Sequence, residues 1–120
     1  MTAASQTTFD TALFKRAYEE WDIPALLGLY GDEVELTQIS GDNPPSSPRT
    51  QHGKEVFRGM FEHCKSAGVK ATVEHTVADE EHAAATVTCE FPGGRKVVAN
   101  AILELQDGRI VREHDVVSGD

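Results

Sequence analysis

The second half of the chain consists of four segments in which apolar and polar residues alternate. These segments cover 69–78, 82–91, 96–106 and 109–117, and three breaks rich in Asp, Glu, Gly and Pro separate them. A period of two is typical of strands with one buried face, and short breaks of this composition are typical of turns between paired strands. The pattern therefore predicts a meander of four strands.

The first half of the chain has helical periodicity instead. An apolar residue recurs every four positions from 9 to 21, which predicts an amphipathic helix with Thr8 as its N-cap. Asp22, followed by Pro24 in the first turn, predicts a second, short helix that runs to about residue 30. A third helix is expected over 53–68, where Gly68 suits its end. Residues 34–39 alternate like a strand, and 40–50 are expected to form a loop.

This order of elements predicts an α+β fold, with helices packed on one face of a curved, mainly antiparallel sheet. The 120 residues favour one domain, which we place at 8–120 after a flexible tail at 1–7. The formal net charge of −9 makes nucleic acid and anionic membranes poor partners. No apolar run is long enough to span a membrane, and with Cys64 and Cys89 expected as reduced thiols, we expect a cytoplasmic protein.

The faces of the strands indicate which side chains point inward. In 69–78 the apolar face includes His75, which should therefore point toward the helices. In 96–106 the odd positions are all apolar, while the even positions, among them Asn100 and Ile102, are mixed. Either the odd face packs on the helices, or it forms a subunit contact while the even face lines a pocket. Its small residues suit a contact between sheets, which favours a homodimer through the outer sheet face.

Several short stretches resemble the nuclear transport factor 2-like superfamily, which includes ketosteroid isomerase, SnoaL-type polyketide cyclases and limonene epoxide hydrolase. The stretches are Trp21-Asp22-Ile23-Pro24, His52-Gly53-Lys54-Glu55 and Asp107-Gly108-Arg109-Ile110-Val111. The resemblance covers almost the whole chain and implies a cone-shaped fold with three helices from the N-terminal half on the concave face of the sheet. Because this fold carries many activities, the function must be argued from the site.

The hairpin over 91–99 is similar to that of ketosteroid isomerase, but the catalytic residues of that enzyme are not retained. The resemblance aligns its oxyanion tyrosine with Phe14, its aspartate base with Gln38, its protonated aspartic acid with Ile102 and its supporting tyrosine with Phe61. Phe and Ile can neither move a proton nor stabilise a dienolate. Isomerisation by that mechanism is therefore disfavoured. Epoxide hydrolysis is disfavoured as well, because no second aspartate is in register.

The last strand resembles the SnoaL-type cyclases, in which an aspartate at the position of Asp115 serves as general acid/base. Glu113 lies on the same face one pleat away, where we expect a solvated or pocket-rim residue rather than a catalyst. A carboxyl in an apolar cavity has a raised pKa, and a neighbouring carboxyl raises one of the two further, which suits proton transfer near neutral pH. Alternatively, Asp115 is a structural acid paired with His75, Arg95 or Arg112.

These observations lead to a functional hypothesis with one alternative. We expect a pocket for a small, largely apolar carbonyl or polyketide-like compound, with Asp115 catalytic and with no cofactor and no metal site. The five histidines lack the spacing of metal ligands. The alternative is a module that binds a ligand or a protein without catalysis. Nine further residues are expected at the pocket: Phe14, Tyr30, Gln38, Phe57, Phe61, His75, Asn100, Ile102 and Glu113.

Overall fold

A computed structural model describes residues 8–120, so the predicted tail at 1–7 lies outside the described residues. Three helices and six strands follow one another along the chain: α1 (Thr11–Glu20), α2 (Ile23–Gly28), β1 (Tyr30–Ile39), β2 (Arg49–His52), α3 (Lys54–Ser66), β3 (Lys70–Ala78), β4 (His82–Glu90), β5 (Lys96–Gln106) and β6 (Arg109–Gly119). The strands form one sheet in the order β2-β1-β6-β5-β4-β3. The β1–β6 pair is parallel and the other pairs are antiparallel.

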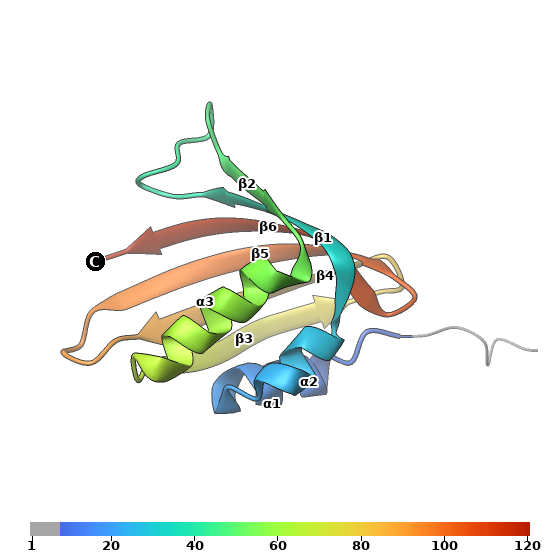
Figure 1. The fold of residues 1–120 in the computed structure, drawn as a ribbon, viewed down its shortest axis with the longest axis horizontal. Helices are drawn as coiled ribbons and strands as arrows, with labels where there is room; N and C mark the ends of the chain where they lie inside the picture. The colour runs from blue at the N-terminus through green and yellow to red at the C-terminus, as the bar shows by residue number, and fades with distance from the viewer. Residues whose placement is uncertain (1–7) are drawn as a thin grey trace, which may run out of the picture.

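The sheet curves, and the three helices lie against its concave side, as Figure 1 shows. Helix α3 runs across the middle of the sheet, while α1 and α2 lie at one end of it. The predicted α+β fold, with its cone-shaped sheet, is thereby confirmed. Within residues 8–120, no helix is long and apolar enough to cross a membrane.

Side-chain caps fix where the first two helices begin. Asp10, not Thr8, caps α1: its carboxylate accepts a hydrogen bond from the Leu13 N–H at 2.9 Å, so the predicted cap was two residues early. The predicted cap of α2 is confirmed, since Asp22 accepts from the Ala25 N–H at 3.3 Å. Between the two helices, Trp21 adopts a left-handed conformation (φ 51°), and its indole Nε1 donates to the Val69 carbonyl at 2.7 Å.

Part of the expected loop at 40–50 is a strand. Arg49–His52 forms β2, which pairs antiparallel with β1, and the His52 ring lies 2.9 Å from the Glu35 carboxylate. Four mostly exposed residues give no readable alternation, so only the pairing with β1 defines this strand.

The odd face of β5 packs on the helices, which decides between the two alternatives that the sequence left open. Ala101, Leu103 and Leu105 are buried, whereas Ile102 on the even face is 53% exposed. The expectation that the odd face forms a subunit contact is therefore wrong. Its small residues instead leave space between the sheet and the helices.

The free edge of the sheet at β3 is covered by α1. The backbone carbonyl of Val73 accepts a hydrogen bond from the Lys15 ammonium at 2.8 Å, and its N–H donates to the Glu19 carboxylate at 3.0 Å. Unpaired backbone groups on an edge strand are a template for association with another chain, so these side chains protect the edge.

Candidate functional site

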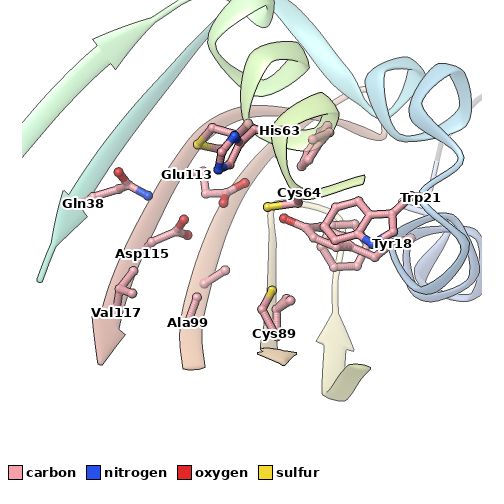
Figure 2. Close-up of a pocket in the computed structure, with 15 residues that line it drawn as sticks. Tyr18, Trp21, Gln38, His63, Cys64, Cys89, Ala99, Glu113, Asp115 and Val117 are labelled. Atoms are coloured by element: carbon pink, nitrogen blue, oxygen red, sulfur yellow. The ribbon is translucent and has the colours of Figure 1, made fainter. Parts of the chain in front are cut away.

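A cavity of about 250 Å³ lies between the helices and the concave face of the sheet. Figure 2 shows it together with the fifteen residues that line it. Four aromatic side chains from α1, its C-cap and α3 form one wall: Phe14, Tyr18, Trp21 and Phe61. Small or apolar residues of β4, β5 and β6 form the floor: Val87, Cys89, Ala99, Ala101 and Val117. Most of the lining is therefore apolar, and the few polar groups stand out.

The wall is a packed aromatic cluster. Tyr18 contacts Phe14 and Phe61 edge to face, with ring centroids 5.2 and 5.4 Å apart, and Trp21 lies 5.7 Å from Tyr18. These residues belong to the apolar face of α1 and the facing side of α3, so the helical pattern that builds the core also builds the wall.

A β-bulge in β6 turns two carboxyl groups into the cavity. Leu105 of β5 pairs with Ile110, but Glu104 pairs with Arg112, so Val111 is an extra residue. Because an extra residue reverses the alternation of a strand, Ile110 is buried before the bulge, and Glu113 and Asp115 are buried after it. Without the bulge, burial of Ile110 would turn both acids toward solvent.

Glu113 is held inside by a tyrosine behind the cavity. Its side chain is only 3% exposed, and its Oε1 accepts a hydrogen bond from the Tyr30 hydroxyl at 2.9 Å. Burial, followed by the charge of Asp115, raises the pKa of Glu113 well above its ordinary value, and the bond from Tyr30 offsets this only partly. Glu113 is therefore the member of the pair that keeps its proton.

Asp115 is the more accessible member of the pair, although it is only 7% exposed. It pairs in register with Gln38 on β1 and with Ala101 on β5, and Figure 2 shows the Gln38 amide next to its carboxyl group. Among residues 8–120, the buried Oδ1 has no hydrogen-bond partner. Burial raises the pKa of Asp115, whereas Glu113, Gln38 and His114 lower it, so Asp115 loses its proton before Glu113 does.

Other polar groups reach the same space. The hydroxyl of Tyr18 points from the aromatic wall into the cavity, and burial together with the two nearby carboxyls raises its pKa well above 10. It is therefore a neutral donor. Cys64 and Cys89 also line the cavity, and burial raises the pKa of both thiols, that of Cys89 to about 11. Both remain protonated at neutral pH.

The structure places the predicted site residues in three groups. Phe14, Gln38, Phe61, Glu113 and Asp115 all line the cavity. The expectation that Glu113 lies solvated at the rim is wrong, because the bulge and Tyr30 bury it.

Tyr30 and Phe57 form a second layer behind the cavity. Both side chains are fully buried, and their ring centroids lie 4.3 Å apart. Neither lines the cavity, and Tyr30 reaches it only through its bond to Glu113.

Three residues that we expected at the pocket lie elsewhere. Asn100 is on the outer face, where its Oδ1 accepts a hydrogen bond from the Thr86 hydroxyl at 2.8 Å, and Ile102 is exposed beside it. Both belong to the even face of β5, which points away from the helices. His75 is exposed because a bulge interrupts β3 between Glu74 and Val77 and places His75 at φ +56°.

The alternative in which Asp115 is a structural acid requires an ion pair with His75, Arg95 or Arg112, and within residues 8–120 none of these three forms one with it. Arg112 lies on the outer face, where it pairs with Glu35 and Glu104 at 3.1 and 3.3 Å. The guanidinium of Arg95 lies 4.8 Å above the Phe91 ring, and His75 is outside the cavity. Within the described part of the chain, Asp115 forms no salt bridge with any of them.

The sequence reasoning missed Tyr18 and the two thiols as cavity residues. Tyr18 had a signal, since it widens the apolar stripe of α1 and is the only member of that stripe with a hydroxyl. Cys64 and Cys89 fall on the inward parities of α3 and β4 but look like ordinary core residues. Within residues 8–120, no group of three or more His, Cys, Asp or Glu side chains is arranged to hold a metal ion.

Comparison with known proteins shows which family and which fold the chain shares. Residues 11–113 match the family model described as a SnoaL-like domain. No curated protein matches the chain.

Among solved structures, a Kribbella flavida protein provisionally named a ketosteroid isomerase is similar, at 20% identity, with a TM-score of 0.69, over 88% of this chain and 75% of the other. A Pseudomonas putida protein provisionally named a polyketide cyclase has 21% identity and a TM-score of 0.63, over 87% and 85%. An NTF2-like protein of unknown function from Cytophaga hutchinsonii has 17% identity and a TM-score of 0.65, over 95% and 93%. At these identities, the likeness concerns the fold alone.

Proposed function

The chain belongs to the SnoaL-like domain family, and on that premise we propose that its cavity binds a small, largely apolar carbonyl or polyketide-like compound and transfers a proton on it. Asp115 is the general acid/base. The observation that carries this proposal is the buried Oδ1 of Asp115, which lines an apolar cavity and has no partner in the described chain. A buried acceptor without a partner destabilises a fold, so a ligand atom is the natural group to pair with it.

The two carboxyl groups have different roles in this proposal. Glu113, fixed by Tyr30, stays protonated and acts as a hydrogen-bond donor, while Asp115 accepts a proton from the carbon next to the ligand carbonyl. The negative charge that develops on the carbonyl oxygen is stabilised by neutral donors, for which the Glu113 carboxyl and the Tyr18 hydroxyl are available. Return of the proton to another carbon gives an isomerase. Attack of the carbanion on a second carbonyl, whose oxygen then takes the proton back from Asp115, gives a cyclase.

Hydrogen exchange tests the proposal without knowledge of the natural substrate. A compact cyclic ketone such as 2-tetralone is incubated with the protein in D₂O, and loss of the signals of the protons next to its carbonyl is followed by NMR. We expect the protein to accelerate exchange and Asp115→Asn to slow it by about 10²- to 10⁴-fold, the usual contribution of a general base. Asp42→Asn removes an aspartate from an exposed loop and is the matched control. Equal exchange rates with the wild type and Asp115→Asn would refute the role of Asp115.

A second candidate function is ligand binding without turnover. It is favoured by Phe14, Gln38 and Phe61, which occupy positions where the resemblance to ketosteroid isomerase calls for catalytic groups. In that case, 2-tetralone would bind in the cavity, but the protein would not accelerate its exchange above the rate of the buffer.

We also propose that the protein is a cytoplasmic homodimer that associates through the outer face of the sheet. Three apolar side chains are exposed there or at its rim: Val77, Ile102 and Val116, at 65, 53 and 54%. Burial of such side chains against a second copy would remove them from water. Sedimentation should give a dimer, and Ile102→Glu should shift it toward monomer. A wild-type monomer at high concentration would exclude the homodimer.

A further inference from the structure

Within residues 8–120, the cavity is lined by acidic side chains but by no Lys or Arg. The acidic groups are the carboxyls of Glu113 and Asp115. The remaining polar groups are the Tyr18 hydroxyl, the Gln38 amide, the His63 ring and two thiols that stay protonated. The whole chain carries a formal charge of −9. A ligand carboxylate in this cavity would face a negative charge with no guanidinium or ammonium group to offset it, in a medium where charges interact more strongly than in water.

The position of the unpartnered acceptor indicates which ligand group fits. An ionised Asp115 has only acceptor atoms, and its Oδ1 is buried without a donor among the described residues. A positively charged N–H is the strongest donor to a carboxylate, because attraction between the charges adds to the hydrogen bond. The aromatic wall of Phe14, Tyr18, Trp21 and Phe61 offers an apolar surface for the rest of such a ligand.

We propose that the cavity binds apolar amines in their protonated form, with the ammonium group on Asp115 and the apolar body against the aromatic wall. This inference shares with the proposed function the premise that the cavity takes a small molecule, but it needs no turnover. Amine binding and proton transfer can therefore succeed or fail separately.

The chain supplies its own reporter for the test. Trp21 is its only tryptophan, and it lines the cavity, so its fluorescence reports on a bound ligand. Three adamantane probes of matched shape and without absorbance of their own are titrated at pH 8: the aminomethyl, the hydroxymethyl and the carboxylate derivative. Calorimetry provides an independent measure of each affinity.

We expect the amine to bind at least 10-fold more tightly than the alcohol, and the carboxylate to bind most weakly. Asp115→Asn should lower the affinity for the amine to that for the alcohol and leave the alcohol unchanged. Asp42→Asn, which removes the same formal charge from an exposed loop, should change none of the three affinities and so controls for general attraction to an acidic protein.

Three results would overturn the proposal. The first is a carboxylate probe that binds as tightly as the amine, the second is an unchanged ratio of amine to alcohol affinity in Asp115→Asn, and the third is no binding of any probe. The ranking of the three probes on the wild-type protein tests the proposal even if the variant does not fold. Accelerated exchange of 2-tetralone together with no preference for the amine would refute this inference and leave the proposed function intact.

Discussion

Replacement of Asp115 by asparagine is expected to make the protein more stable at pH 8 and to change its stability little at pH 3. Burial raises the pKa of Asp115 in the folded state, whereas in the unfolded chain this pKa is about 3.9. Between those two values the folded protein binds more protons than the unfolded one, so the free energy of unfolding falls as the pH rises through this window. Above it, the wild type carries the full penalty of a buried charge, which asparagine lacks.

The size of the effect follows from the burial of the group. A polar group that is buried without a compensating hydrogen bond costs about 1–3 kcal/mol, and Asp115 is 7% exposed with Oδ1 unpartnered. Since asparagine keeps a polar amide there, we expect a gain of about 1–2 kcal/mol at pH 8. For a domain of this size, that corresponds to a rise in Tm of roughly 3–10 °C.

Thermal unfolding followed by far-UV circular dichroism at pH 3, below the pKa of the unfolded carboxyl, and at pH 8 measures both values. Asp42→Asn, at an exposed position, should leave Tm within about 1 °C of the wild type at both pH values, since isolated surface substitutions have small effects. A variant of Asp115 that is destabilised equally at both pH values would show that the carboxylate forms favourable contacts, and the argument from unpaired burial would be wrong.

Three further substitutions test other parts of the structure. Tyr30→Phe removes the donor to the buried carboxyl of Glu113 and should lower the free energy of unfolding by about 1–3 kcal/mol; an unchanged urea midpoint would contradict the hydrogen bond. Lys15→Met leaves the edge carbonyl of Val73 without its donor and should cost about 0.5–1.5 kcal/mol. Loss of the exposed ion pair between Arg16 and Glu20 of the same helix should cost less in the same urea titration. His75→Gly should keep or raise Tm, because glycine adopts φ +56° without strain, and should leave ketone exchange unchanged; slower exchange would mean that His75 contributes to the site.

Much of the fold could be predicted because the signals that define it are local. The four period-two segments became β3 to β6, and Asp22 with Pro24 begins α2 as expected. Strand β2 could not be predicted, since four residues without clear alternation form a strand only through their pairing with β1.

The site was harder to predict because two bulges reverse the alternation on which the reasoning rests. In β3 the bulge at His75 carries the end of the strand outward, so His75 and Val77 are exposed although their parity matches that of the buried Val73. In β6 the bulge at Val111 turns Asp115 inward. Asp115 and Ile110 are therefore both buried, although one is at an odd position and the other at an even position. A bulge depends on the partner strand, and neither sequence segment signals it. Asp115 was expected inside from the family resemblance, whereas periodicity alone left its direction open.

The stability of Asp115→Asn and its activity toward a ligand are informative only when both are measured. A gain of stability in Asp115→Asn would show that the folded chain holds an unfavourable charge, but a ligand site and an accident of packing would both give that result. Loss of ketone exchange or of amine binding would show that the carboxylate acts on a ligand, but a distorted cavity would give the same loss. A variant that is more stable at pH 8 and has lost exchange or amine binding cannot be explained by distortion, because a damaged cavity would also destabilise the fold. That combination would identify Asp115 as a group whose burial opposes folding and supports function.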